Sequence, residues 1–542
     1  MNFRIYIDTK KGWKKYNQGK FNIFFKGYSN NMTLKSLFND LIKKNFSTKG
    51  CINLLNKLDG HFSLIFFKEK KFIIAADRIS SVPLIIKKNK SDFIIADNYI
   101  NICKGFETKK NPQIDFFQSK ILAMSGFTFG KDSLFKNIIK TLPGMLYIFK
   151  NKNLEKIKYY DWQPYKKKLK TNHNVIKNEL KRINELIISK LIKSSNNRCI
   201  AVPLSAGYDS RFILSGLVKL GYKNIFAFSY GRKENREKKI AKKIVNQLKI
   251  PWTFIEFNKK NIKEALLSHD YQKFKDFSDL TCSIHFPQDF FAIKFLKINN
   301  IIPTDSIIVN GQTGDFISGN HIPFKSENDT YQEVINAFVQ KHFKISKKLM
   351  TLMDETLKEA LKKRISSHDI DIKNLTQVRE SLQKIEYEDR QAKYVIGGQR
   401  TYEYFGYDWR LPLWDKDYIS FWEKTDIKYK INQSLFKEVL EEQNWADVWK
   451  KYPLNPKNTF PINISILRFI FKCIVGISGK ENWHKFELRF LDYFITPLCG
   501  YSALKYLDVA LDNKGYTSPL GWHTQDYLNK KGINWKGLPL NE

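Results

Sequence analysis

The chain has 542 residues, of which 42% are hydrophobic. A chain of this length does not bury its apolar side chains in one core, so we expect two or three globular domains. Lys and Arg number 92 and Asp and Glu number 54, giving a formal net charge of +38. Because lysine is spread along the whole chain, we interpret this charge as a compositional bias, with a nucleic acid partner as the less favoured alternative.

Six cysteines are scattered without CxxC spacing, which fits neither a disulfide framework nor a zinc site. The N-terminus has no apolar signal segment, so we expect a cytoplasmic protein. The nearest approach to a membrane span, 464–477, is interrupted by Arg468 and Lys472. We predict a packed helix there and no membrane insertion, with a helix on a membrane surface as the alternative.

Residues 1–165 are rich in strand patterns. Short apolar runs at 21–25, 61–67, 71–76 and 93–96 are separated by polar turns. Runs that are apolar on both faces predict sheets covered on each side, so we expect a layered β-sheet domain.

Three short motifs follow one another in this domain: Leu58-Asp59-Gly60, Ala76-Asp77-Arg78 and Val82-Pro83-Leu84. They resemble the glutaminase domain of glutamine-hydrolysing asparagine synthetases, which has an Ntn-hydrolase fold. In that family the nucleophile is a cysteine at position 2, where this chain has Asn2, and its first cysteine is Cys51. An amide does not replace a thiolate nucleophile, so we predict a degenerate domain that keeps the fold without glutaminase activity.

The glutamine-binding Asn-Gly-Glu of that family is replaced as well. Lys26-Gly27-Tyr28 stands at its expected place. We therefore expect the domain to serve a structural role, covering the second domain.

From residue 174 strands and helices alternate. Apolar periodicity predicts a helix over 174–193, strands at 199–202, 224–231, 252–257 and 306–309, and helices between them. This alternation predicts a doubly wound parallel sheet with its ligand at the carboxyl ends of the strands.

The loop after the first of these strands is made of small residues, Ser205-Ala206-Gly207, followed by Asp209 and Ser210. Small side chains let a polyanion approach the backbone at a helix N-terminus, and a carboxylate there suits magnesium. The loop resembles the Ser-Gly-Gly-x-Asp-Ser pyrophosphate loop of the ATP pyrophosphatases, with Ala206 in place of one glycine. An ordinary strand-to-helix turn is the alternative.

Two later strand ends agree with this resemblance. Phe228-Ser229-Tyr230-Gly231 is similar to the Phe-Ser-x-Gly beside adenine in the asparagine synthetases. The segment 310–319 resembles their Ser-Gly-Glu-Gly-x-Asp-Glu-x-x-Gly-Gly, with Gly311, Gly314 and Asp315 matching and Gln312 replacing the glutamate.

Two further segments follow the family pattern. Residues 406–415 resemble Gly-Leu-Glu-x-Arg-x-Pro-Phe-Leu-Asp, with Asp408 at the glutamate. A folding role, with Arg410 and Asp415 as an internal ion pair, is as well supported as a catalytic one. Asn455-Pro456-Lys457 stands where the family has an active-site lysine, and a surface lysine is the alternative.

The resemblance implies an ATP-dependent amide-forming ligase that adenylates a carboxylate, releases pyrophosphate and transfers ammonia or another amine. It implies a synthetase domain over 174–465, with 466–542 as an extension packed on it. ATP and Mg²⁺ are the implied cofactors, with Asp209 and Asp315 as metal ligands. The implied catalytic residues are Lys457, Asp408 and Gln312, and the implied nucleotide-binding residues are Leu204, Ser205, Gly207, Asp209, Ser210, Phe228, Ser229, Gly311 and Gly314.

Two alternatives remain at this point. One is a nucleotide-binding protein of the same superfamily without synthetase activity. The other is a tRNA-modifying enzyme with the same loop. The motifs identify neither the carboxylate nor the nitrogen donor.

Overall fold

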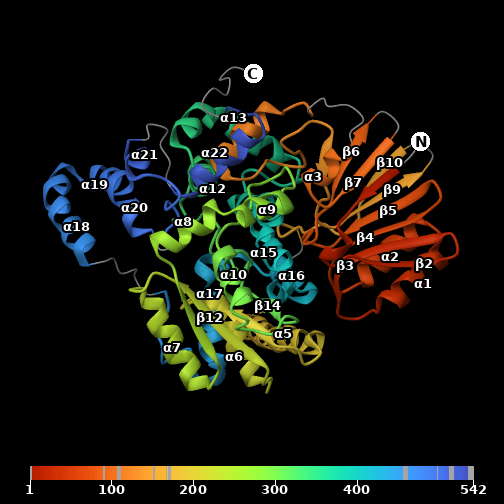
Figure 1. The fold of residues 1–542 in the computed structure, drawn as a ribbon, viewed down its shortest axis with the longest axis horizontal. Coiled ribbons are helices and arrows are strands. Elements are labelled where there is room, and N and C mark those ends of the chain that lie inside the picture. Colours follow the sequence, from red (N-terminus) through yellow and green to blue (C-terminus); the bar gives the residue numbers. More distant parts are fainter. Residues whose placement is uncertain are drawn as a thin grey trace.

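The computed structural model describes residues 3–89, 92–105, 112–150, 153–166, 168, 172–455, 462–496, 498–511 and 518–534. Within these residues the chain forms three sheets, one of four, one of six and one of five strands. The first two belong to the N-terminal part of the chain, which occupies one side of the molecule (Figure 1). The predicted mixed α/β architecture with several sheets is confirmed.

The six-stranded sheet is antiparallel in the order β10-β9-β5-β4-β3-β2. Its strands are β2 (Lys14–Gln18), β3 (Phe21–Ser29), β4 (Gly60–Lys68), β5 (Lys71–Ala76), β9 (Met145–Lys150) and β10 (Asn153–Lys158). The four-stranded sheet, in the order β1-β7-β6-β8, contains β1 (Phe3–Tyr6), β6 (Ile85–Asn89), β7 (Asp92–Ala96) and β8 (Ile138–Lys140).

These two sheets pack face to face because alternate side chains point into the space between them. Phe93 of β7 meets Phe149 of β9 there, with ring centroids 4.8 Å apart. The next residues along each strand, such as Ile94 and Ile148, face outward into separate clusters. Helices α1 (Leu34–Lys44) and α2 (Thr48–Lys57) cover one outer face, and α3 (Tyr99–Cys103) and α4 (Phe116–Ser125) lie on the other side. The sheets are thus covered on both faces, as their apolar runs predict.

The five-stranded sheet is parallel throughout, in the order β13-β12-β11-β14-β15. Its strands are β11 (Ile200–Pro203), β12 (Ile225–Gly231), β13 (Trp252–Glu256), β14 (Ile307–Val309) and β15 (Asp408–Arg410). The chain runs outward from β11 to β13 and then returns to β14 on the other side of β11. The direction of winding therefore reverses between β11 and β14, and ligands of such sheets bind at this crevice.

Helices surround this sheet. Those nearest to it in sequence are α5 (His173–Ser195), α6 (Tyr208–Lys219), α7 (Arg236–Leu248) and α10 (Phe290–Ile298). The other α-helices between residues 172 and 455 are α8 (Lys259–Leu267), α9 (His269–Ser278), α11 (Gly314–Ile317), α12 (Tyr331–His342), α13 (Lys347–Ser366), α14 (Leu375–Glu386), α15 (Gln399–Tyr404), α16 (Lys416–Lys424) and α17 (Ser434–Gln443). A π-helix, Tyr387–Val395, continues α14.

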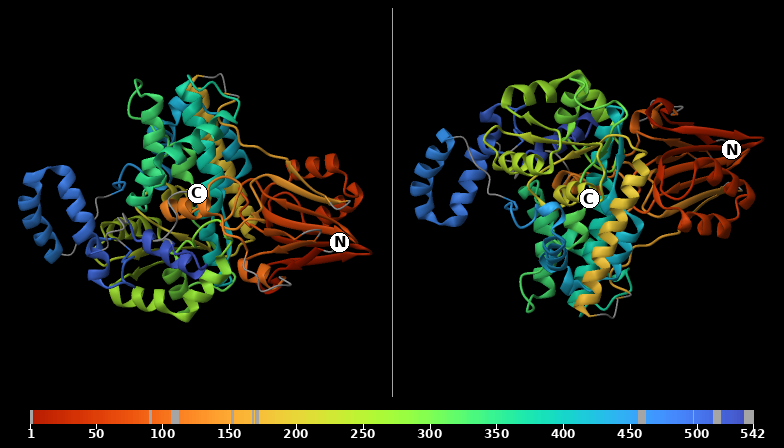
Figure 2. Two further views of the ribbon diagram at one scale, coloured as in Figure 1. Left: turned by 90° about the horizontal axis from the view of Figure 1, so that it is seen from above. Right: turned by 90° about the horizontal axis from the view of Figure 1, so that it is seen from below.

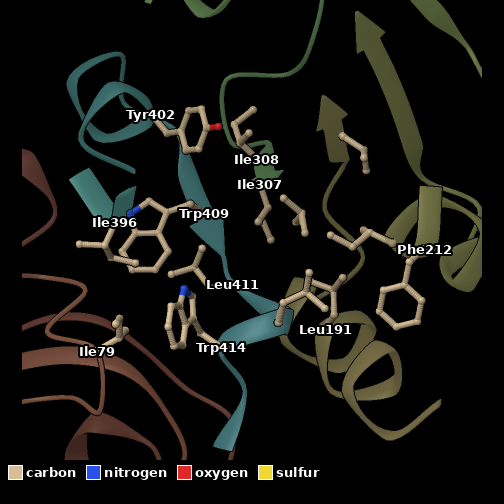
Figure 3. Packing of buried hydrophobic residues seen from close by; sticks show 14 of the residues in the cluster. Ile79, Leu191, Phe212, Ile307, Ile308, Ile396, Tyr402, Trp409, Leu411 and Trp414 are labelled. Carbon is tan, nitrogen blue, oxygen red and sulfur yellow. The ribbon is translucent and has the colours of Figure 1, made fainter. Parts of the chain in front are cut away.

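One hydrophobic cluster joins the two parts of the molecule. Trp409, Leu411 and Trp414 lie beside Ile307 and Ile308 of the parallel sheet (Figure 3). Ile79 of the N-terminal part belongs to the same cluster. Across this boundary the Lys26 ammonium donates to Glu403 at 2.7 Å, with both side chains buried. The N-terminal part therefore covers the parallel-sheet part through apolar packing and a buried ion pair.

The remaining helices are α18 (Ile462–Val475), α19 (Lys480–Phe486), α20 (Asp492–Ile495), α21 (Tyr506–Ala510) and α22 (Leu520–Lys530). Helix α22 returns to the body and contacts α4. Helices α18 to α20 form a lobe that projects from the side opposite to the N-terminal sheets (Figures 1 and 2).

The expectation of a packed helix at 464–477 is wrong for its outer face: Phe469 is 70% exposed and Ile477 is 88% exposed. The physical reason is that α18 is apolar around most of its circumference and has neighbours on one side alone. Among the described residues, no helix is both long and apolar enough to cross a bilayer.

Candidate functional site

The crevice at the point where the winding reverses is formed by two loops. The first joins β11 to α6, and the second joins β14 to α11. They border a cavity of about 440 Å³, and the first turn of α6 also lines this cavity. The first N–H groups of a helix have no partner within it, and the helix dipole adds partial positive charge at this end. The cavity is therefore suited to an anion.

Serine hydroxyls hold the first loop in its shape. The Ser205 N–H donates to the Ser210 hydroxyl at 3.0 Å, and the Gly207 N–H donates to the Ser205 hydroxyl at 3.1 Å. The two hydroxyl oxygens are 3.1 Å apart. These bonds fold the loop over the start of α6, so Ser205, Gly207 and Ser210 lie together as the motif predicts.

Two glycines let the second loop approach Asp209. A Cβ atom at Gly311 would lie 2.6 Å from Asp209 Cβ, and one at Gly314 would lie 2.3 Å from Asp209 Oδ1. No side chain fits at Gly311 unless the backbone moves, and none fits at Gly314 unless the Asp209 carboxylate shifts. This close approach allows the Asp315 N–H to donate a hydrogen bond to Asp209 Oδ2 at 3.1 Å. Glycine is thus required at Gly311 and Gly314 for the approach of the two loops.

The two carboxylates differ in their surroundings. Asp209 Oδ1 is buried without a hydrogen-bond partner among the described residues. Burial, and then the charge of Asp315, raise the pKa of Asp209 well above its usual range. A cation placed between the two side chains would reverse this effect and stabilise both as carboxylates.

A histidine that the motifs do not identify supports Asp315. His321 Nε2 lies 3.1 Å from Asp315 Oδ2, and its Nδ1 lies 2.5 Å from Glu386 Oε1. Burial opposes a charged ring, but the carboxylates on either side raise the pKa of His321 to about 9. Burial also opposes the charge on Asp315, but the hydrogen bond and charge of His321, together with the charge of Arg390, outweigh it and lower the pKa of Asp315.

No signal in the sequence marks this arrangement. His321 follows the second loop outside its glycine pattern, and Glu386 is 65 residues further on. They meet because the C-terminal end of α14 packs beside α11, which is a tertiary contact.

These residues fit a magnesium ion held together with substrate phosphates. Among the described residues no group of three or more His, Cys, Asp or Glu side chains could hold a metal by itself. Magnesium is commonly bound by one or two carboxylates and completed by phosphate oxygens and water. Asp209, with its unpartnered buried oxygen, and Asp315 supply such a pair.

A second cavity of about 630 Å³ adjoins the first, and both are bordered by Ser205. Leu204, Phe228 and Ser229 border it together with the aromatic rings of Phe254 and Phe257. The Ser229 hydroxyl donates to the Leu204 carbonyl at 2.7 Å and accepts from Trp252 Nε1 at 3.0 Å, so it fixes the wall of the cavity. A flat apolar ring such as adenine suits this lining.

Gln312 lies at the edge of the first cavity. Its Oε1 accepts a hydrogen bond from Gln399 Nε2 at 2.8 Å, and its Nε2 would lie 2.4 Å from a Cβ atom at Gly398. Gln399 is a further residue at this position that the motifs do not indicate. An amide pair of this kind carries no charge.

Asp408 is not brought to this cluster. It pairs in register with Ile307 at the amino end of β14, away from the loops at the carboxyl ends. Its carboxylate, 58% exposed, pairs with Arg198 at 2.7 Å. The register of β15 therefore removes Asp408 from the candidate catalytic set.

The expected ion pair between Arg410 and Asp415 is also absent. Asp415 Oδ1 accepts from Lys190 at 3.0 Å. The Arg410 guanidinium instead bonds Ser194 and lies over the Tyr28 ring, 4.1 Å from its centre. The segment 406–415 thus joins the two parts of the molecule and serves the fold.

Lys457 lies outside the described residues. The segment before it does reach the site, because the Asn455 N–H donates to the Ala206 carbonyl at 3.2 Å. Asn455 also borders the first cavity.

The described N-terminal part contains two cysteines, Cys51 and Cys103, and burial raises the pKa of both thiols. Cys51 is fully buried between α2 and the sheet, and burial raises the pKa of its thiol to about 11. Lys26, at the expected glutamine-binding position, is buried and paired with Glu403. Asn2 lies outside the described residues.

No protein family model matches the chain, and no curated protein matches it. Among solved structures it has a distant likeness to the allosteric regulatory enzyme of purine biosynthesis, at 11% identity and a TM-score of 0.17, over 44% of this chain and 61% of that one. It also has a likeness to glutamine phosphoribosylpyrophosphate amidotransferase from B. subtilis, at 9% identity and a TM-score of 0.19, over 59% of this chain and 70% of that one. Scores this low carry no argument about the fold or the activity.

Proposed function

We propose that the chain is an ATP-dependent carbon–nitrogen ligase that activates a carboxylate as its acyl-adenylate. The observation that carries the proposal is the buried, unpartnered Oδ1 of Asp209 in the first turn of α6, whose other oxygen, Oδ2, accepts from the Asp315 N–H. A buried carboxylate next to a second one is costly unless a cation binds there. A helix N-terminus and a small-residue loop beside such a pair favour a metal-bound polyphosphate.

The adjoining cavity supports a nucleotide as the polyphosphate ligand. An adenine ring against Phe228 and Leu204 would place its triphosphate along the loop 204–207 toward Asp209. Mg²⁺ bound with the phosphates would neutralise charge on the departing pyrophosphate. The N–H groups of the loop and of the first turn of α6 would hold the same oxygens.

In the reaction a substrate carboxylate oxygen attacks the α-phosphorus of ATP and pyrophosphate leaves. An amine or ammonia then attacks the acyl carbon, the bond to AMP breaks, and the amine loses a proton. Gln312, held in place by Gln399, would orient the acyl group by hydrogen bonds, and no carboxylate is available at position 312 to act as a base. Lys457 remains our candidate for the charge that meets the phosphate and acyl oxygens in the closed site.

The cysteine content of the N-terminal part indicates which nitrogen donor the protein uses. Since Cys51 is buried with a raised pKa and position 2 is asparagine, we propose that glutamine is not hydrolysed and that ammonia or another amine is used directly.

A screen of carboxylates and amines for production of AMP and pyrophosphate from ATP tests the proposal. We expect release with at least one carboxylate, dependence on Mg²⁺, and loss of release in Asp315→Asn. Tight ATP binding without pyrophosphate release for any acid would favour a nucleotide-binding protein. Release that requires tRNA would favour a tRNA-modifying enzyme.

A further inference from the structure

The outer face of α18 is apolar and exposed. Six large hydrophobic side chains on or just beyond this helix are between 44% and 88% exposed: Ile466, Leu467, Phe469, Ile470, Ile474 and Ile477. At about 3.6 residues per turn these positions form one continuous face, a little under half of the helix circumference. Single exposed apolar residues need no explanation, whereas a continuous apolar face marks an interaction site.

The opposite face of α18 is already occupied. Phe471 packs against Phe486 of α19, with ring centroids 5.1 Å apart, and the Arg468 guanidinium lies over the ring of buried Trp483. Arg468 also pairs with Glu487. The lobe is therefore held together on one side of α18 and needs nothing from the other side.

The charges around the face are basic. Residues 462–480 contain Arg468, Lys472 and Lys480 and no Asp or Glu. Lys472 and Lys480 are exposed. On α19 the exposed Lys485 pairs with the exposed Glu481 at 2.8 Å, so these two side chains add no net charge. An apolar strip bordered by lysines matches an anionic surface whose interior is apolar.

We propose that this face of α18 binds the surface of an anionic lipid bilayer, with the helix lying in the plane of the interface. The face belongs to one projecting helix and consists of Ile, Leu and Phe, which suit the acyl boundary. It lacks the Tyr, Trp and Arg that are enriched in the centres of protein interfaces. A second copy is disfavoured because two chains of net charge +38 repel.

This binding is peripheral. Helix α18 has 14 residues, and no helix among those described is long and apolar enough to span a bilayer. The inference does not depend on the proposed ligase activity, because the lobe and the nucleotide cavity are separate features.

Co-sedimentation of the full chain with lipid vesicles tests the proposed membrane binding. One set of vesicles contains equal parts of phosphatidylcholine and phosphatidylglycerol, and the other contains phosphatidylcholine alone. We expect binding to the anionic vesicles to be at least about tenfold tighter than to the neutral ones, and to weaken with salt. Phe469→Asp with Ile474→Asp should weaken anionic-vesicle binding by at least about tenfold. The matched control, Leu267→Asp with Ile298→Asp, alters two isolated apolar residues that are 59% and 65% exposed, and should bind like the unmodified chain.

Thermal unfolding of each variant checks the fold, and unchanged melting is expected because the four side chains are exposed. The inference is overturned if the unmodified chain does not sediment with anionic vesicles, or if the α18 variant binds as tightly as the control. A dimer in solution that the α18 variant dissociates, without vesicle binding, would assign the face to a second copy instead.

Discussion

At the scale of single residues, the site depends on the close approach of two loops at Gly314. Substitution Gly314→Ala places a methyl group on Asp209 Oδ1, so the Asp209 carboxylate or the loop that carries the methyl group has to shift. Displacement of about 1 Å near reacting groups costs roughly 100-fold in rate, and we expect carboxylate-dependent pyrophosphate release to fall by about that factor. The control is Gly397→Ala, where a Cβ atom meets nothing within 4 Å. Equal loss in both variants would show that the position of the loop is not the cause.

A substitution at Asp209 is expected to change ATP binding without lowering the stability of the fold. Asp209→Asn keeps the size of the side chain and removes a buried carboxyl group from beside Asp315. We expect the Mg²⁺-dependent part of ATP binding to be lost, while the melting temperature without ATP does not fall. Calorimetric titration and thermal unfolding measure the two effects. A lower melting temperature with unchanged ATP binding would make Asp209 a structural residue.

At the scale of elements, the buried ion pair between β3 and α15 is expected to hold the two parts of the molecule in register. Lys26→Met leaves Glu403 buried with Arg400 as its remaining cationic partner, at 2.8 Å. Removing one member of a buried pair costs about 3–5 kcal/mol, and we expect a loss toward the lower end of that range. Lys20 pairs with Glu69 at 3.3 Å on the surface, and Lys20→Met should cost less than about 1 kcal/mol. Chemical denaturation compares them, and equal losses would contradict the assigned role of Lys26.

The C-terminal helix α22 is joined to the body through a buried histidine. His523 stacks on Trp522 and meets His285, with ring centroids 5.2 Å apart. Burial, and then the charge of Lys275, lower the pKa of His523 to about 3. The unfolded chain therefore binds more protons than the folded one between about pH 3 and pH 6.5, so stability falls as the pH is lowered through this range.

His523→Gln should reduce the slope of the unfolding free energy against pH, over this pH range, by up to about 1.4 kcal/mol per pH unit. Denaturation curves at several pH values measure it. His484→Gln is the matched control, because the His484 side chain is 56% exposed. If His523→Gln leaves the slope unchanged, the ring is protonated in the folded protein and this account of α22 is wrong.

How far the sequence predicts the structure depends on the range of the contacts. Four of the five parallel strands and the two loops follow from local patterns, because a buried strand, small residues and a helix start are contiguous in the chain. The fifth strand, β15, is only three residues long and is not predicted. The link from Asp315 through His321 to Glu386 depends on the packing of α11 against α14, which no local pattern contains. The motif misplaces Asp408, because the register of the short strand β15 decides which edge of the sheet this residue occupies. Periodicity shows that α18 is apolar, but it does not show which of its faces has a neighbour.

At the scale of the whole molecule, the charge of +38 bears on nucleic acid binding. If the charge is a compositional bias, binding to RNA should be weak, independent of sequence and lost as salt is raised, because phosphate contacts release counterions. Filter binding over a range of salt concentrations measures this. Salt-resistant binding to one RNA would favour the tRNA-modifying alternative over a small-molecule ligase.

We propose that a carboxylate oxygen attacks the α-phosphorus of ATP at the cluster formed by Asp209, Asp315 and the loop after β11. The most direct test uses a substrate acid, found by the screen, labelled with ¹⁸O in its carboxyl group. We expect one labelled oxygen to appear in AMP, because the bond between the acyl carbon and that oxygen breaks when the amine attacks. Label in inorganic phosphate with ADP as product would show attack at the γ-phosphorus. Label in neither product, with AMP formed, would show hydrolysis of ATP without activation of the acid, and either result would contradict the proposed chemistry.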